Sequence, residues 1–352
     1  MQAKLTQWIH KQWQKKGILA RLLYPLSLIT AKTVKKRQQK KVTRPTQWPP
    51  IIIVGNILVG GTGKTPIVIY LCKQLKQMGW HPGVISRGYG VKIKNKAIAG
   101  TAPLDARYVG DEPSLIAQAA KVPIAVHPNR NCAVEALLKL APAVDVIISD
   151  DGLQHYALGR DIEIIVQDDR GIGNGWLIPA GPLREPAKRK NKVDWVITHH
   201  TSPAVKKTNT DIANSQKQEK KVKQVEMRLK PTHITQLAKN KNFTTQHWLK
   251  QHTNTPCQAI AAIGQPQRFF SMLKQMGIQL TSTKALPDHE VIKESDIKLF
   301  ATYPILITSK DAVKLKQTPL QKDPRFWVVH VTPTFSPDNW VEKLAANLKD
   351  KK

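Results

Sequence analysis

Short, largely apolar runs recur along the first half of the chain and alternate with segments whose apolar residues return at helical spacing. The runs cover residues 51–54, 83–86, 122–126, 144–148 and 162–166. Each is short and apolar enough for a strand that is buried on both faces of a parallel sheet. Helical segments are expected between them at 67–78, 112–120 and 132–140. This alternation predicts an α/β fold with a mainly parallel sheet.

A second, smaller α/β unit is expected toward the C-terminus. Residues 259–263, 304–307 and 326–331 have the composition of strands, and helices are expected at 267–276 and near the C-terminus. Before this unit, the chain becomes rich in Lys, Gln and Asn, which is typical of an exposed connection. We therefore expect four parts, namely an N-terminal segment at 1–42, a core domain at 43–202, a polar connector at 203–225 and a smaller C-terminal α/β domain at 226–352.

The N-terminal segment interleaves Trp, Leu and Ile with Lys and Arg. Its apolar run, 17–31, is interrupted by Arg21 and Pro25 and is shorter than the about 20 apolar residues that a helix needs to cross a bilayer. No signal-peptide cleavage pattern follows it. The composition favours an amphipathic helix that lies on an anionic membrane surface, followed by a basic tract at 32–41. The alternative is a helix packed on the domain that follows, with a solvated basic connector.

The net charge points to an anionic partner. The chain has 352 residues, with 55 Lys and Arg against 25 Asp and Glu, and a formal charge of +30. Nucleic acid, an anionic membrane or a phosphorylated substrate would each suit that charge. The absence of a recognised nucleic-acid motif and an aromatic content of 6% argue against nucleic acid. The three cysteines are far apart and lack zinc or disulfide spacing, so a reducing cytoplasm fits best.

A glycine-rich segment joins the first predicted strand to the first predicted helix. It consists of Gly60, Gly61, Thr62, Gly63, Lys64 and Thr65. A strand, a glycine-rich turn and a helix N-terminus together form a phosphate cradle of backbone N–H groups. We therefore expect ATP here, with Lys64 on the β- and γ-phosphates and the Thr65 hydroxyl on Mg²⁺. Leu58 stands where the usual pattern has its first glycine, and Gly60 and Gly61 are expected to supply the permissive backbone instead.

Two pairs of acidic residues are candidates for the chemistry around that phosphate. Asp150 and Asp151 end the strand at 144–148, where a metal-binding carboxylate belongs in such sheets. The other reading is a strand-terminating turn. Asp111 and Glu112 open a helix after Gly110, which by itself indicates helix capping.

A kinase also needs a group that takes or orients the proton of the acceptor hydroxyl, and a carboxylate at a helix start is suitable for that task. His289, in a later loop, could pair with such a carboxylate. A lone histidine is more often a structural residue, so the residues alone leave both roles open.

Taken together, these segments resemble one family, the tetraacyldisaccharide 4'-kinases. The resemblance runs from about residue 8 to about residue 331 and covers the following markers in order: Gly60 to Thr65 with Pro66, Ser86 to Gly90, Gly110 to Pro113, Asp150 to His155, Gly173 to Gly175, Pro179 to Pro186, Gly264 to Phe269, Pro287 to His289, and Thr308 to Val313. The number of markers makes the resemblance specific.

The resemblance implies a P-loop kinase core at 43–202 that transfers the γ-phosphoryl group of ATP to the 4'-hydroxyl of tetraacyldisaccharide 1-phosphate in lipid A (lipopolysaccharide) biosynthesis. It implies a peripheral or monotopic enzyme on the cytoplasmic face of the bacterial inner membrane. Its partners would be the lipid disaccharide and the anionic membrane surface, with no nucleic acid and no obligate protein partner evident.

The resemblance also implies roles for individual residues. Asp111 matches the family's catalytic carboxylate and His289 the histidine that pairs with it. Glu112, Asp150 and Asp151 match acidic residues assigned to Mg²⁺ or to holding the site, together with Thr65 on the metal and Lys64 on the phosphates. Glu185 is a further candidate for the acidic cluster.

Two residues of this chain depart from the family motifs. Leu153 and Leu286 stand where the family motifs have Phe, so packing behind Asp151 and His289 is expected to differ.

The alternative function is a membrane-associated regulatory P-loop ATPase of the partitioning type. Such switches usually carry a signature Lys at the position of Val59.

Overall fold

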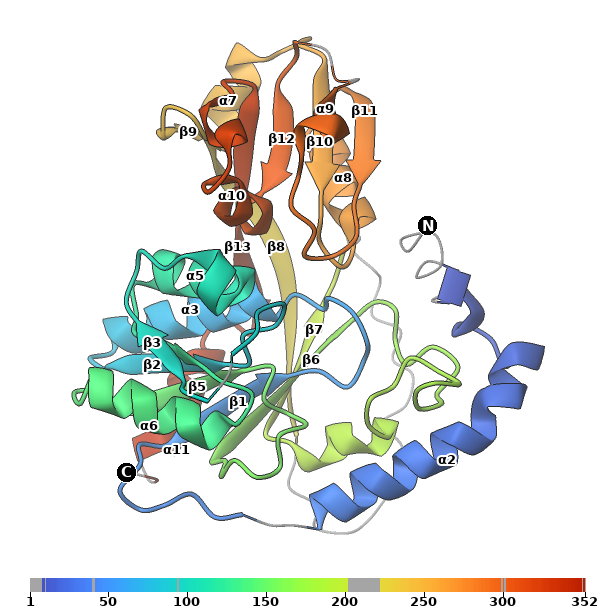
Figure 1. Cartoon of the computed structure of the whole chain (residues 1–352), viewed down its shortest axis with the longest axis vertical. Coiled ribbons are helices and arrows are strands. Elements are labelled where there is room, and N and C mark those ends of the chain that lie inside the picture. Colours follow the sequence, from blue (N-terminus) through green and yellow to red (C-terminus); the bar gives the residue numbers. More distant parts are fainter. Residues whose placement is uncertain are drawn as a thin grey trace. The chain divides into compact units, whose positions relative to one another are not determined.

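The structure is a computed structural model that describes residues 8–9, 11–39, 42–93, 95–201, 222–298, 300, 302–349 and 351. It divides into two compact units, each of which combines segments that are distant in sequence (Figure 1). The first unit contains Thr65–Asp150 and Lys230–Pro333, and the second contains Ile9–Lys64, Asp151–Leu229 and Thr334–Lys352. The sequence-based boundaries at 42, 202 and 225 stay predictions. Most of the expected connector, up to residue 221, lies outside the described residues.

One part of the first unit is a group of four neighbouring strands, one of which ends at Asp150. Strands β2 (Pro82–Ser86), β4 (Ile124–Val126) and β5 (Val146–Asp150) are parallel, in the order β5-β2-β4, and β3 (Ile98–Gly100) pairs antiparallel with β4. Helix α5 (Asp111–Ala120) contacts β4, and α6 (Arg130–Leu140) contacts β2, β3 and β4. Helices α3 (Lys64–Gln77) and α4 (Ala106–Val109) complete this segment. The parallel strands bring Ser86 and Asp150 to the same edge of the sheet.

The rest of the first unit is a second group of strands in the order β11-β10-β12-β13-β8. These are β11 (Leu280–Ala285), β10 (Cys257–Ala261), β12 (Ile305–Thr308), β13 (Phe326–Ser336) and β8 (Lys223–Gln236), with β9 (Lys241–Thr244) antiparallel to β8. The first four strands of this order pair in parallel. The helices are α7 (Thr245–Gln251), α8 (Pro266–Gln275), α9 (Glu294–Ile297) and α10 (Ser309–Leu315), with a 3₁₀ turn at Pro319–Lys322.

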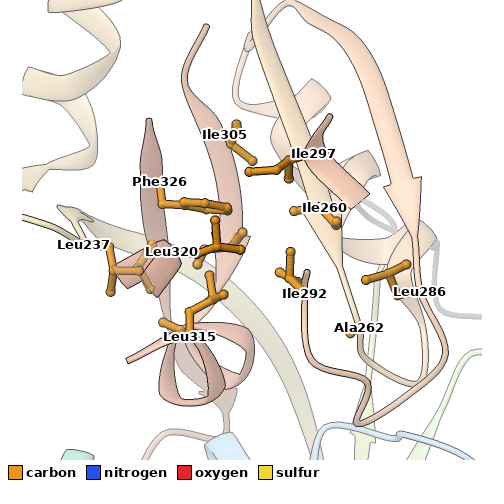
Figure 2. Packing of buried hydrophobic residues seen from close by; sticks show 13 residues of the cluster. Leu237, Ile260, Ala262, Leu286, Ile292, Ile297, Ile305, Leu315, Leu320 and Phe326 are labelled. Carbon is orange, nitrogen blue, oxygen red and sulfur yellow. The ribbon is translucent and has the colours of Figure 1, made fainter. Parts of the chain in front are cut away.

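This segment has a dense apolar core. Figure 2 shows Ile305, Leu320 and Phe326 turned toward the same interior as Ile292 and Ile297. Leu286 belongs to the same cluster, so the residue that replaces the expected Phe still fills an apolar position three residues before His289. A shorter side chain at a buried site buries less area, but Leu286 keeps the loop attached to the core.

The second unit is built around strands β1 (Ile51–Gly55), β6 (Ile162–Asp168) and β7 (Trp195–His199) and the start of β8, in the order β1-β6-β7-β8 and all parallel. A 3₁₀ turn at Ala187–Lys192 precedes β7, and α11 (Trp340–Lys349) packs an edge of the Trp340 ring on Trp195. All five residues of β1 are buried. Leu153, the other departure from the family motifs, is buried against Gly55.

The mainly parallel α/β fold class is confirmed by these strand pairings. The predicted strands at 51–54, 144–148 and 162–166 correspond to β1, β5 and β6, and the predicted helices at 112–120 and 267–276 correspond to α5 and α8. Strands β7, β8 and β11 were not expected from the sequence. Strand β8 begins at Lys223, inside the segment assigned to the connector.

The N-terminal helix of the second unit, α2 (Ile18–Gln38), continues through Pro25 and into the basic tract. It contacts the rest of the unit through small or aromatic side chains: Ser27 Oγ donates to the Leu177 carbonyl at 2.7 Å, and the Tyr24 ring lies 4.5 Å from that of Trp176. Several of its large aliphatic residues are instead exposed, namely Ile18, Leu22, Leu26, Leu28 and Ile29. Among the described residues, no helix is long and apolar enough to cross a membrane.

Candidate functional site

The glycine-rich loop connects β1 to α3 as expected. Gly60 and Gly63 both have φ of +93°, a conformation that glycine adopts without steric cost. Asn56 Nδ2 donates to the Gly60 carbonyl at 3.2 Å and to Thr62 Oγ1 at 3.3 Å, which holds the turn from inside. Leu58 is buried and forms an isolated β-bridge with Leu183. The first glycine of the usual pattern is therefore replaced by a packing residue, and the tight turn starts two residues later.

Arg170 and His199 contact backbone carbonyls of this loop, and no motif in the sequence indicated either residue. The Arg170 guanidinium donates to the carbonyls of Val59 at 3.4 Å and Gly61 at 3.2 Å. The same guanidinium forms a bidentate pair with buried Asp168, at 2.8 to 3.0 Å. His199 Nδ1 lies 3.3 Å from the Thr62 carbonyl. An Asp and an Arg two residues apart in a turn resemble a surface pair, so no local signal distinguished them.

Asp151 lies between two cations in the second unit. Its Oδ1 is 3.3 Å from Lys64 Nζ, and its Oδ2 accepts a hydrogen bond from Arg184 Nη1 at 3.2 Å. Burial would raise the pKa of this carboxyl, but the charges of Lys64 and Arg184 outweigh it and lower the pKa to about 2. Asp151 is therefore an anion that orients the lysine of the phosphate loop.

Asp150 has different surroundings. It is the last residue of β5, is buried, and accepts a hydrogen bond from Ser86 Oγ at 3.3 Å in the first unit. Arg130 Nη2 lies 3.5 Å from the Asp150 backbone carbonyl. Asp151 follows the strand in a turn, with φ of +49°, and the two neighbouring carboxylates have separate partners. Asp150 faces a hydroxyl, whereas Asp151 faces cations.

Asp111 and His289 meet in the first unit. His289 Nδ1 lies 3.0 Å from both carboxylate oxygens of Asp111, and its ring lies 4.8 Å from that of Tyr89. His289 has φ of +69°, which is uncommon for a residue other than glycine and typical of functional positions. Burial raises the pKa of Asp111, but the hydrogen bond from His289 and the charge of Lys310 lower it to about 2. The carboxylate is thus held ionised.

Lys310 joins this pair to two further carboxylates. Its ammonium donates to Glu112 Oε1 at 2.8 Å and to Asp288 Oδ1 at 3.1 Å, and it lies 3.8 Å from Asp111 Oδ2. Burial would lower the pKa of this lysine, but the three carboxylates raise it. In the sequence, Lys310 is recognisable only as part of a family marker, because its partner Glu112 is 198 residues away.

Glu185 belongs to a structural network and not to an open acidic cluster. It is fully buried and accepts hydrogen bonds from Tyr156, from Gln154 Nε2 at 2.9 Å and from Gln38 Nε2 at 3.1 Å. Arg189 forms an ion pair with Glu185, with Nε 3.4 Å from Oε2. Gln154 also donates to the Asn56 carbonyl at 2.9 Å. This network links the end of α2 to the start of the phosphate loop within the second unit.

The candidate metal ligands offer oxygen atoms, which Mg²⁺ prefers. In the described part of the chain, no group of three or more His, Cys, Asp or Glu side chains is gathered closely enough to hold a metal ion. Glu112 and Asp151 each face a lysine ammonium. Asp150 is a buried carboxylate that accepts a hydrogen bond from the Ser86 hydroxyl.

The comparisons with known proteins agree on one family. Residues 19–349 match the family described as LpxK, tetraacyldisaccharide-1-P 4'-kinase. The chain is 42% identical over 349 residues to the tetraacyldisaccharide 4'-kinase of Bordetella parapertussis, covering 98% of this chain and 97% of that protein. It is 42% identical over 308 residues to the enzyme of the same name from Pasteurella multocida, covering 86% of this chain and 88% of that protein.

A solved structure supports the fold. LpxK from Aquifex aeolicus in complex with ATP superposes with a TM-score of 0.72 at 22% identity, covering 94% of this chain and 99% of that chain. The glycine-rich loop between a buried strand and a helix, in a mainly parallel α/β fold, defines a nucleotide-binding protein of the P-loop class. Within that class, the chain belongs to the tetraacyldisaccharide-1-P 4'-kinase family and is a phosphotransferase. The regulatory ATPase alternative is not favoured.

Proposed function

We propose that this chain transfers the γ-phosphoryl group of ATP to the 4'-hydroxyl of tetraacyldisaccharide 1-phosphate in lipid A biosynthesis. The observation that carries the proposal is the phosphate loop, with Lys64 opening α3 beside Asp151, in a chain of this kinase family. Phosphoryl transfer depends mainly on positioning and on stabilising negative charge. We assign the stabilisation of charge on the phosphate to the phosphate loop. We assign the positioning of the acceptor hydroxyl to Asp111.

At the phosphate end, the N–H groups of the loop and the N-terminus of α3 bind the phosphate oxygens. The ammonium group of Lys64 binds the β- and γ-phosphates, and Asp151 orients the Lys64 side chain. Arg170 fixes the carbonyls of Val59 and Gly61, which sets the direction of the intervening N–H groups. These interactions stabilise the charge that develops on the γ-phosphoryl oxygens.

Magnesium is the expected companion of ATP. The Thr65 hydroxyl and the Asp150 carboxylate are the residues we assign to it, with Glu112 and Asp151 as further candidates whose present partners are lysines. When bound, Mg²⁺ neutralises charge on the phosphate oxygens.

At the acceptor end, the oxygen of the 4'-hydroxyl attacks the γ-phosphorus, and Asp111 accepts the proton of that hydroxyl. The bond from phosphorus to the bridging β–γ oxygen breaks, and ADP leaves with that electron pair. His289 orients Asp111 through the 3.0 Å contact from Nδ1. An ionised, buried carboxylate in contact with a histidine is suited to this step, because it can accept the hydrogen bond of the acceptor hydroxyl and is held in one direction.

The lipid acceptor requires access to a membrane. Helix α2 exposes Ile18, Leu22, Leu26 and Ile29, and Lys35, Lys36 and Arg37 follow in its last turn. Apolar residues beside a basic turn suit a helix that lies at an anionic membrane surface. We therefore place the enzyme at the cytoplasmic face of the bacterial inner membrane as a peripheral or monotopic protein. No role for nucleic acid or an obligate protein partner is proposed.

The test is phosphate transfer by the purified full-length chain. The chain is incubated with ATP labelled at the γ-phosphate and with tetraacyldisaccharide 1-phosphate in detergent, and the lipid is separated by thin-layer chromatography. A labelled bisphosphorylated lipid is expected, and it should be absent with Lys64→Ala. Hydrolysis of ATP that the lipid stimulates without labelling it would instead support a regulatory ATPase.

A further inference from the structure

Lys310 contacts the ring nitrogen of His289 that Asp111 does not use. His289 Nδ1 faces Asp111, whereas Nε2 lies 3.5 Å from Lys310 Nζ and 3.7 Å from Asp288 Oδ2. Two neighbours of opposite charge therefore compete for one nitrogen. Lys310 is the nearer of the two.

We propose that Lys310 is a positioning residue that fixes the tautomer of His289, so that the ring hydrogen is on Nδ1 and is donated to Asp111. The inference rests on the proposed function in one respect, namely that Asp111 accepts the proton of the acceptor hydroxyl. It adds a residue that acts through His289 and Asp288 on the orientation of Asp111.

The preferred tautomer follows from the hydrogen-bonding capacity of each group. A neutral imidazole has one N–H donor and one nitrogen lone pair, and a lysine ammonium has donors only. An ammonium beside Nε2 therefore favours the lone pair there, which leaves the hydrogen on Nδ1. On Nδ1 this hydrogen meets both oxygens of Asp111 at 3.0 Å. The opposite tautomer would set a lone pair against a carboxylate.

Asp288 is the competing group, and Lys310 also engages it. A carboxylate near Nε2 favours a hydrogen on that nitrogen. Lys310 binds the other oxygen of Asp288, Oδ1, at 3.1 Å, and so weakens the attraction of Asp288 for a proton on His289. Without the ammonium, Asp288 would draw the ring hydrogen to Nε2 or favour a doubly protonated ring.

The side chain of Lys310 is held firmly enough for this role. It is the second residue of α10, whose N-cap is Thr308, and α10 packs on α5, the helix that begins with Asp111. Only 13% of the Lys310 side chain is exposed, and Glu112 Oε1 binds the ammonium at 2.8 Å. A lysine restrained by carboxylates on two sides is not a solvated surface residue.

The experiment measures the tautomer directly. The full-length protein is labelled with ¹⁵N-histidine, and the imidazole nitrogens are observed by long-range ¹H–¹⁵N correlation, with His289→Gln used to assign the signals. The wild-type protein is expected to show a protonated Nδ1 and an unprotonated Nε2 at His289. In Lys310→Met, His289 is expected to shift to the Nε2–H or doubly protonated form. Adding Asp288→Asn to that variant should restore the Nδ1–H form.

Matched controls separate this role from general stabilisation. Lys314→Met removes another buried ammonium of α10, one that pairs with Asp311 at 3.0 Å and donates to the backbone carbonyl of Glu290 at 2.8 Å rather than to the His289 ring, and it is expected to leave the His289 tautomer unchanged. Lys310→Arg keeps the charge and should keep the Nδ1–H form. If Lys310→Met does not fold, Glu112→Gln/Lys310→Met removes one of the carboxylates left without its cation and allows the same measurement.

The kinetic readout is a fall in kcat of roughly tenfold or more for Lys310→Met, with the KM for ATP nearly unchanged. A folded Lys310→Met protein whose His289 remains in the Nδ1–H form would overturn the proposal, whatever its activity. Because the tautomer is read without substrate, this outcome differs from failure of the proposed function, which would appear as a wild-type protein that does not phosphorylate the lipid.

Discussion

His289 Nδ1 lies 3.0 Å from both carboxylate oxygens of Asp111, although the two residues are 178 positions apart in the sequence. Asp111 opens α5, and His289 lies in the loop after β11. Packing between α5 and α10 within one unit accompanies this contact. The pair is thus a product of tertiary structure, and its function can be tested separately from nucleotide binding.

Asp111→Asn should reduce kinase turnover strongly while ATP still binds. The amide keeps the size of the side chain but cannot accept the hydroxyl proton, and general-base contributions are roughly 10²- to 10⁴-fold. Turnover is measured on the disaccharide lipid, and ATP affinity by titration with a fluorescent nucleotide. As a control, Asp105→Asn changes a half-buried aspartate that caps α4 and should retain activity. Near-normal turnover of Asp111→Asn would remove this residue from the mechanism.

The free energy of unfolding of Asp111→Asn should fall less at low pH than that of the wild-type protein. Because the folded protein lowers the pKa of Asp111 to about 2, its ionisation adds stability above the unfolded pKa of about 4. That stability is lost as the pH falls through about 2. A shift of this size corresponds to about 2 kcal/mol in the free energy of unfolding.

Urea unfolding between pH 6 and pH 2 measures this effect. The decline of the wild-type free energy of unfolding below about pH 4 should exceed that of Asp111→Asn. Other acidic groups, including Asp151, titrate in both proteins and cancel in the difference. Parallel curves for the two proteins would show that Asp111 is not preferentially ionised in the folded state.

Local patterns in the sequence predicted the elements that local chemistry determines. The apolar run at 51–54 and the glycines before Lys64 are adjacent in sequence, so strand, loop and helix follow from neighbouring residues. Strand β8 was missed because its residues are mostly polar. Only alternate positions, such as Val225 and Met227, are buried in its first half, and this short period-two signal was outweighed by the Lys- and Gln-rich composition.

Contacts between distant segments could not be read from the sequence in this way. The resemblance to a family proposed Asp111 with His289, but nothing in the local pattern around Lys310 indicates that it meets Glu112. Arg170 shows the same limit. Its pairing with Asp168 is local, whereas its contact with Gly61 spans 109 positions.

Arg170→Met should weaken ATP binding without changing the lipid KM. The guanidinium fixes two carbonyls of the phosphate loop, and loss of these charge-assisted hydrogen bonds frees the loop backbone. We expect the KM for ATP to rise roughly tenfold, since small errors in position are costly in phosphoryl transfer. Steady-state kinetics with each substrate varied in turn measures the difference.

A closely matched control exists for this prediction. Arg107 forms the same bidentate pair with an aspartate two residues earlier, Asp105, but it is exposed and its guanidinium lies over the Tyr108 ring. Arg107→Met should therefore leave the KM for ATP unchanged. Equal effects of the two substitutions would mean that Arg170 acts only through general stability.

The exposed aliphatic residues of α2 should determine binding to membranes. Leu22→Ser/Leu26→Ser removes two leucines that are 72% and 49% exposed and keeps the basic last turn of the helix. Each leucine that enters the lipid interface contributes about 1 to 2 kcal/mol, so the double variant should bind anionic vesicles at least roughly tenfold more weakly. Vesicle sedimentation measures the binding.

Leu140→Ser is the control for this last prediction, because Leu140 is a similarly exposed leucine, at 45%, on α6. It should bind vesicles like the wild-type protein. The remaining binding of the α2 variant should fall with added salt, since Lys35, Lys36 and Arg37 are retained and exposed charges are screened. If the α2 variant binds vesicles as tightly as the control, the exposed face of this helix does not contact lipid, and the acceptor must reach the enzyme by another surface.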